Sequence, residues 1–147
     1  MRLTDHFTIE EFAHTDLQDF KEKNLSEAHS HLGNILKVCD ELEKIRKFFG
    51  APVTITSGFR FPELNTAVKG SKTSQHTKGE AADFSVAGHA DRKGLEFVFE
   101  WCRHNIVYGQ LILETPENRT PWIHFGLPRP NRVPTALLWD GKEYRAA

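Results

Sequence analysis

The chain has 147 residues, of which 39% are hydrophobic and 27% are charged, and its formal net charge is −1 at pH 7. This length and composition predict one globular domain over residues 1–147. The near-neutral charge argues against a nucleic-acid partner, and no apolar run is long enough for membrane insertion.

The amino-terminal segment does not resemble a secretory signal. Residues 1–12 carry charges at Arg2, Asp5, Glu10 and Glu11 and contain no apolar core, so we expect synthesis in a cytoplasm without a signal peptide. The order Thr8-Ile9-Glu10-Glu11 has the form of a capping box and predicts a short helix. Residues 14–30 are polar and show no periodicity that would assign them to an element.

The clearest helix is predicted over Leu32–Phe49. Apolar residues recur there at helical spacing, and Gly50 follows as a stop signal. Cys39 lies on this apolar stripe, and Cys102 lies on that of a second predicted helix. We expect both cysteines to be small buried hydrophobic residues, with a disulfide or a thiol ligand as the alternative.

The second half of the chain contains most of the predicted strands. Short β-branched or alternating segments favour strands over residues 52–56, 81–86, 110–114 and 122–126. Helices are predicted over residues 62–68 and 91–104, a polar loop over 69–80, and one edge strand through residues 137–139. Early helices and late strands are typical of an α+β domain, with an antiparallel sheet packed by helices.

Three side chains in this pattern are suited to a metal ion. Side chains alternate between the two faces of a strand, so Asp83 and His124 can project from one side if their strands are antiparallel neighbours. His76 precedes Asp83 by seven residues, and Gly79 between them allows the loop to fold back. Two imidazoles and one carboxylate are a ligand set that leaves a coordination position of zinc open for water.

Several short motifs in the chain resemble those of one enzyme family. They are Ser57-Gly58-Phe59-Arg60, Asn65, Gly70-Ser71, Ser74-Gln75-His76, Gly79, Ala81-Ala82-Asp83 and Trp122-Ile123-His124. Together they resemble the zinc D-Ala-D-Ala carboxypeptidases and L-Ala-D-Glu endopeptidases, the M15-type murein peptidases that include many phage endolysins. The resemblance runs from about residue 3 to residue 126 and implies the fold shared with hedgehog signalling domains.

The resemblance also implies roles for individual residues. By position, His76, Asp83 and His124 match the Zn²⁺ ligands. Arg60 matches the arginine that holds the substrate and polarises its carbonyl, while Ser74 and Gln75 match residues that line the same cleft.

The resemblance does not assign the general base directly, because the sequence departs from the family pattern at the position of that residue. Many relatives carry an acidic residue three positions before the last histidine, where this chain has Pro121. Glu114 ends the preceding predicted strand and is our candidate base, with Glu117 as the alternative. Trp122 is expected either to fill the core or to form a wall of the cleft.

The predicted function is hydrolysis of an amide bond in the stem peptide of peptidoglycan, with zinc as the cofactor. The single domain without a signal peptide or wall-binding module favours a monomeric L-Ala-D-Glu endopeptidase of the phage type over a D-Ala-D-Ala carboxypeptidase. Such a lysin reaches the cell wall through a holin or in a virion tail. The alternative is a zinc-containing binding domain of the same fold that does not catalyse turnover.

Overall fold

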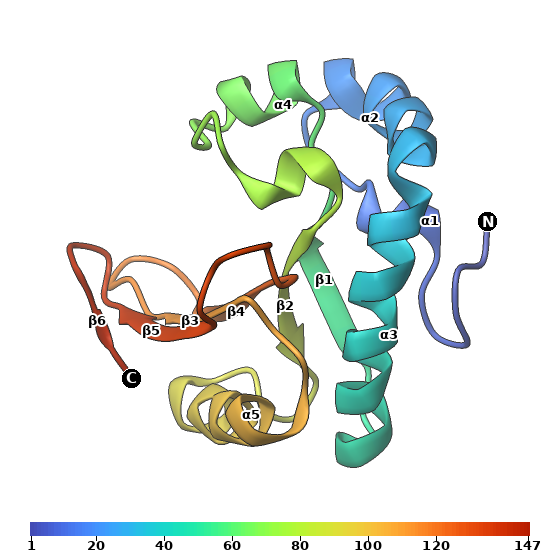
Figure 1. The fold of residues 1–147 in the computed structure, drawn as a ribbon. Coiled ribbons are helices and arrows are strands. Elements are labelled where there is room, and N and C mark those ends of the chain that lie inside the picture. Colours follow the sequence, from blue (N-terminus) through green and yellow to red (C-terminus); the bar gives the residue numbers. More distant parts are fainter.

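The computed structural model describes all 147 residues, and its centre is a six-stranded sheet in the order β1-β2-β4-β3-β5-β6 (Figure 1). The strands are β1 (Val53–Ser57), β2 (Ala81–Val86), β3 (Gln110–Glu114), β4 (Trp122–Gly126), β5 (Thr135–Trp139) and β6 (Tyr144–Ala146). The helices are α1 (Ile9–Phe12), α2 (Lys21–Ala28), α3 (Leu32–Phe49), α4 (Pro62–Ala67) and α5 (Arg92–Asn105), with short 3-10 turns η1 (Gln18–Phe20), η2 (His29–His31) and η3 (Gln75–Lys78).

The two faces of the central strands differ in chemistry. On β2 the residues Ala82, Phe84 and Val86 are fully buried in the hydrophobic core, whereas Asp83 and Ser85 on the opposite face are only partly buried. On β4 the core face likewise holds Ile123 and Phe125. The alternation predicted from the sequence therefore separates an apolar face from a face that carries the polar side chains.

Helices α3 and α5 cover the apolar face. Helix α3 buries Ile35, Val38, Cys39, Leu42 and Ile45 and ends at Gly50, which has a left-handed φ of 59°. A fully buried Ile or Leu contributes about 1.5–3 kcal/mol, so this stripe is a large part of the core. Helix α5 begins where the Asp91 carboxylate accepts a hydrogen bond from the Gly94 backbone. The positions predicted for both helices agree with the structure.

The amino-terminal helix α1 also forms as predicted. The Thr8 hydroxyl accepts a hydrogen bond from the Glu11 backbone N–H. Ile9 and Phe12 are buried on the inner side of the helix. In Figure 1 the helices α2 and α4 lie together at one end of the molecule, and α5 lies at the opposite end.

The carboxyl-terminal part of the sheet differs from the prediction in two ways. Strand β5 pairs with β3 in parallel, so the sheet is mostly rather than wholly antiparallel. The predicted edge strand through residues 137–139 is instead an inner strand, because β6 pairs with its outer side. Gln110 pairs with both Gly126 at the end of β4 and Thr135 at the start of β5, so the loop between them passes β3 at one end of the sheet. Strand β5 therefore runs antiparallel to β4 and parallel to β3.

Residues 14–30, for which the sequence predicted no element, contain α2. The side chain of Asn24 is fully buried and explains why this polar helix is held in place. Its amide nitrogen donates to the carbonyls of Ala13 and Phe59, and its oxygen accepts from the Phe61 backbone N–H. Asn24 thereby connects α2 to the segment on either side of Arg60.

Both cysteines are buried and free, so Cys39 and Cys102 form no disulfide with each other, as expected. Burial raises the pKa of each thiol to about 12. Each thiol is therefore protonated near neutral pH. No helix in the structure combines the length and the apolar character that a membrane span requires.

Candidate metal centre

Three side chains from separate elements meet on the polar face of the sheet. Asp83 on β2 and His124 on β4 are direct partners across the antiparallel ladder, and the η3 turn brings His76 beside them. Asp83 Oδ1 lies 2.8 Å from His124 Nδ1 and 3.5 Å from His76 Nε2. One donor atom from each residue lies within 4.8 Å of the others, so the arrangement can hold a single metal ion.

The orientation of the His76 ring is set by the backbone. Its Nδ1 lies 2.6 Å from the carbonyl oxygen of Gly58. A carbonyl can only accept, so Nδ1 carries the proton and Nε2 of the neutral ring keeps a free lone pair on the side of Asp83. The backbone also fixes this turn, because the Arg60 N–H donates to the His76 carbonyl at 3.1 Å.

Two glycines permit this close arrangement. A Cβ atom on Gly58 would lie 2.2 Å from the Phe12 carbonyl oxygen, so only glycine allows this strand end to approach α1. Gly79 ends η3 with a left-handed φ of 69°, a conformation that favours glycine. The chain thereby turns directly from η3 into β2, which explains how His76 and Asp83 come together.

The charges within the cluster keep Asp83 ionised. Burial alone would raise the pKa of Asp83, but the neighbouring His76 and His124 outweigh it and hold that pKa well below its usual range. Burial acts to lower the pKa of His124, yet the hydrogen bond and the charge of Asp83 raise it overall. Asp83 is therefore ionised at neutral pH and supplies the negative charge that a divalent cation requires.

Arg60 lies next to the cluster and is held by three neighbours. Its Nε donates to Asn65 Oδ1 at 3.1 Å, and its Nη1 donates to Ser57 Oγ at 3.0 Å. A longer contact of 3.5 Å joins Nη2 to Ser74 Oγ. A guanidinium has five N–H donors, so two remain for a ligand. Burial lowers the pKa of Arg60, while the charge of Asp83 acts in the opposite direction.

Glu114 lies on the same sheet face, in register with Trp122. The Trp122 indole Nε1 donates to Glu114 Oε2 at 2.7 Å. Burial and the charge of Asp83 raise the pKa of Glu114 to about 7, although His124, the Trp122 hydrogen bond and Arg119 act to lower it. A carboxyl group that titrates near neutral pH can exchange a proton under physiological conditions.

A cleft runs past these residues. Two adjoining hollows of about 550 and 940 Å³ share Arg60, Val68, Asp83 and Trp122 in their walls. Ser74 and Gln75 line the smaller hollow, together with His76 and His124. The Gln75 side chain is held there by its donation to the Leu127 carbonyl at 3.0 Å. Trp122 therefore lies in the cleft wall, which is the second of the two positions predicted for it.

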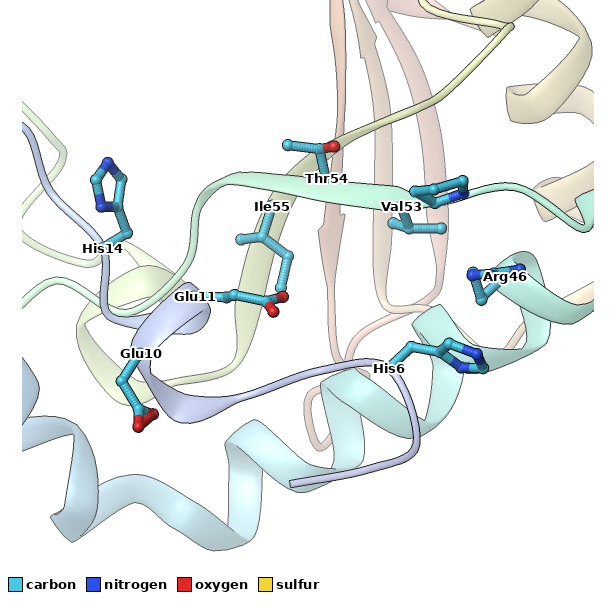
Figure 2. A pocket seen from close by; sticks show the side chains of 9 residues that line it. His6, Glu10, Glu11, His14, Arg46, Val53, Thr54 and Ile55 are labelled. Atoms are coloured by element: carbon cyan, nitrogen blue, oxygen red, sulfur yellow. The ribbon is translucent and has the colours of Figure 1, made fainter. Parts of the chain in front are cut away.

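The remaining histidines do not form a second centre. A separate hollow of about 650 Å³ lies between α1 and β1 and contains His6, Glu10, Glu11 and His14 (Figure 2). These side chains come from different sides of the hollow and do not converge (Figure 2). The only group of three or more candidate ligands in the structure is His76, Asp83 and His124.

Comparison with known proteins agrees with this site. The sequence profile of the Peptidase M15 family matches residues 5–125, which contain all three clustered side chains. The chain belongs to the peptidase M15 family. It is therefore a member of a family of metal-dependent peptidases, and the resemblance seen in the sequence motifs is confirmed. No curated protein matches the chain in a sequence search.

Several residues of this M15 peptidase were not predicted to lie at the cleft. Arg129 and Tyr144 line it from the segment after residue 125, outside the family match, and Arg119 lines it from the loop before β4. Arg119 also packs on Trp122, with its Cζ 4.9 Å from the ring centroid. Arg119 and Arg129 lie on irregular loops, for which the sequence contains no periodic signal, and Tyr144 lies on the short strand β6, which the sequence did not predict.

Proposed function

We propose that this M15 peptidase is a zinc-dependent hydrolase that cuts an amide bond in the stem peptide of peptidoglycan. The main support is the convergence of His76, Asp83 and His124 beside Glu114 and Arg60 in one cleft. The proposed site of action is the bacterial cell wall, and the protein is proposed to act as a monomer.

The donor set of the cluster fits zinc. Zinc prefers imidazole nitrogens and carboxylate oxygens and keeps one position open in catalytic sites with three protein ligands. His76 Nε2, His124 Nδ1 and Asp83 would hold the ion. A zinc ion bound there would supply Lewis-acid chemistry, which polarises a carbonyl and activates water near neutral pH.

Glu114 is proposed to move the proton. Its Oε2 accepts from Trp122, which leaves Oε1 without a hydrogen-bond partner in the protein. Oε1 can then accept a proton from the attacking water and pass it to the leaving amine. Proton transfer by a positioned side chain typically contributes about 10²–10⁴-fold to the rate.

Arg60 is proposed to stabilise negative charge on the substrate. Its guanidinium is held by Ser57, Asn65 and Ser74, so little reorganisation is needed when charge develops on a carbonyl oxygen. Such preorganised donors stabilise transition states strongly. A carboxylate of the peptide is the alternative partner for the same guanidinium.

We propose an endopeptidase, with the L-Ala-D-Glu bond preferred over the terminal D-Ala-D-Ala bond, and the extent of the cleft on both sides of the cluster supports the endopeptidase. The larger hollow continues past Trp122 towards Leu17 and Asn118, and the smaller one continues towards Arg129. An endopeptidase must accommodate substrate residues on both sides of the scissile bond, whereas a carboxypeptidase needs room for one terminal residue. Delivery as a phage-type lysin through a holin or in a virion tail agrees with this preference.

Digestion of purified murein sacculi tests the proposal. The zinc-loaded protein should release soluble fragments, and mass spectrometry of their new amino termini should identify the bond that is cut. Chelation should stop release, and zinc should restore it. Zinc-loaded protein that releases nothing would contradict the proposal and favour the alternative of a binding domain without turnover, for which the Pro121 departure is the sequence support.

A further inference from the structure

Arg129 extends the cleft beyond the segment shared with the family. It follows β4 and lines the hollow that also contains His76, Asp83 and His124. Its Nη2 donates to the Thr73 carbonyl at 3.3 Å, so the side chain spans from the β4–β5 loop to the loop before η3. Arg129 is partly buried, and no acidic side chain forms an ion pair with it.

The strand register places Arg129 at one end of the cleft. Glu114 is in register with Trp122, Ile112 with His124, and Gln110 with Gly126. The order along the cleft is therefore the candidate base, then the metal cluster, then the end where Gln75 lies over Gly126. A Cβ atom on Gly126 would lie 2.1 Å from Gln75 Oε1. Arg129 comes after Gly126 in the chain and lies at the Gln75 end of the cleft, and Gly126 is two residues beyond His124 along β4.

The charge of Arg129 has no partner in the cleft. The acidic groups that line the same hollow are Asp83, which faces the two histidines, and Glu114, which lies at the opposite end with Trp122. Arg129 uses one N–H donor on the Thr73 carbonyl and keeps the others. A guanidinium with free donors in a substrate cleft is suited to binding a carboxylate in bidentate fashion.

We propose that Arg129 is a substrate-binding residue that recognises a free carboxylate of the peptide, about two residues from the scissile bond. The spacing follows from the rise of about 3.3 Å per residue in extended chains. The inference rests on the proposed function and refines its substrate class: the preferred substrate is an anionic peptide whose carboxyl group at this position is not amidated.

Binding measurements test this without depending on turnover. Isothermal titration calorimetry of the zinc-loaded Glu114→Gln protein would use a stem tetrapeptide with free carboxyl groups and the same peptide amidated at one carboxyl at a time. Amidation of the carboxyl group that Arg129 recognises should weaken binding about tenfold relative to the free peptide, whereas amidation elsewhere should not. Adding Arg129→Ala should weaken binding of the free peptide to a similar extent and remove the discrimination against that amidated form.

Matched variants separate recognition from general effects. Arg132 lines the neighbouring hollow with Arg129 but does not line the cleft that contains the cluster, so Arg132→Ala should bind all peptides as the parent protein does. Arg129→Lys keeps the charge without the bidentate geometry and should retain part of the discrimination. The inference is overturned if Arg129→Ala discriminates among the peptides as its parent does, or if it weakens binding of every peptide equally.

Murein cleavage and peptide binding, measured on the same protein, test the proposed function and this inference separately. If wild-type protein cuts no murein but its binding depends on Arg129 and one carboxylate, the hydrolase proposal fails and the recognition site stands. If the protein cuts murein and the Arg129→Ala variant shows an unchanged kcat/KM on free and amidated peptides, the hydrolase proposal stands and the recognition site is rejected.

Discussion

His124 and Asp83 are 41 residues apart in the chain, yet they lie opposite each other in the β2–β4 ladder, with His124 Nδ1 2.8 Å from Asp83 Oδ1. Because the two residues are in register, the rigid part of the sheet sets their spacing. Only His76 comes from a turn, and its ring is oriented by the Gly58 carbonyl. A site built mainly on strands is positioned more precisely than a site built on loops.

Removal of one cluster residue should abolish metal binding and activity together. In His76→Ala or Asp83→Ala the remaining two ligands cannot hold the ion tightly, so we expect loss of stoichiometric zinc and of murein hydrolysis. Metal content measured by mass spectrometry and the sacculus assay check this. His104→Ala is the control, because His104 is an exposed residue near Glu100 on α5. Full activity in either cluster variant would show that the ligands are assigned wrongly.

Loss of the candidate base should slow catalysis without removing the metal. Glu114→Gln keeps the shape of the side chain but cannot accept a proton, so kcat should fall by about 10²–10⁴-fold while the zinc content stays at one per chain. Glu117→Gln, on the exposed loop after β3, should retain wild-type kcat. The reverse pattern would identify Glu117 as the base.

The pH dependence of activity should report the ionisation of Glu114. Only the ionised carboxylate accepts a proton, so kcat/KM should rise with pH through this pKa, which the surroundings raise from 4.5 to about 7. A bound cation lowers the pKa of Glu114, so the acidic limb of the pH profile of kcat/KM should lie between these two values. Trp122→Phe removes a hydrogen bond that favours the ionised form, so the limb should move to higher pH. A limb that stays in place would exclude Glu114 as its source.

Asn24 should contribute strongly to the free energy of unfolding, although it lies in a polar segment. Asn24→Ala leaves three buried backbone groups of Ala13, Phe59 and Phe61 without partners, so the free energy of unfolding should fall by about 3 kcal/mol. Urea denaturation measures this. Asn105→Ala, which removes an exposed hydrogen bond to the Trp101 carbonyl, should cost about 0.5 kcal/mol or less. Equal losses in both variants would contradict the role assigned to Asn24.

Much of the fold could be predicted because its elements have strong periodic patterns. The stripe on Leu32–Phe49 and the alternation over residues 81–86 and 122–126 both depend on burial of one face. The same alternation placed Asp83 and His124 on one side of the sheet. The strand bounds of β2, β3 and β4 agree with the structure for this reason.

The parts that could not be predicted depend on contacts between distant segments. Helix α2 is mostly polar, and besides the buried Ala28 it is held by the three long-range hydrogen bonds of Asn24. The parallel pairing of β5 with β3 and the position of Arg129 both depend on the path of the loop after β4. Neither a loop path nor a long-range hydrogen bond leaves a periodic signal in the sequence.

The most direct test of the metal centre is a crystal structure of the zinc-loaded protein with anomalous data collected at the zinc absorption edge. We predict one strong peak per chain, about 2.0–2.2 Å from His76 Nε2, His124 Nδ1 and a carboxylate oxygen of Asp83. A peak at another location, or none on these three residues, would contradict the account.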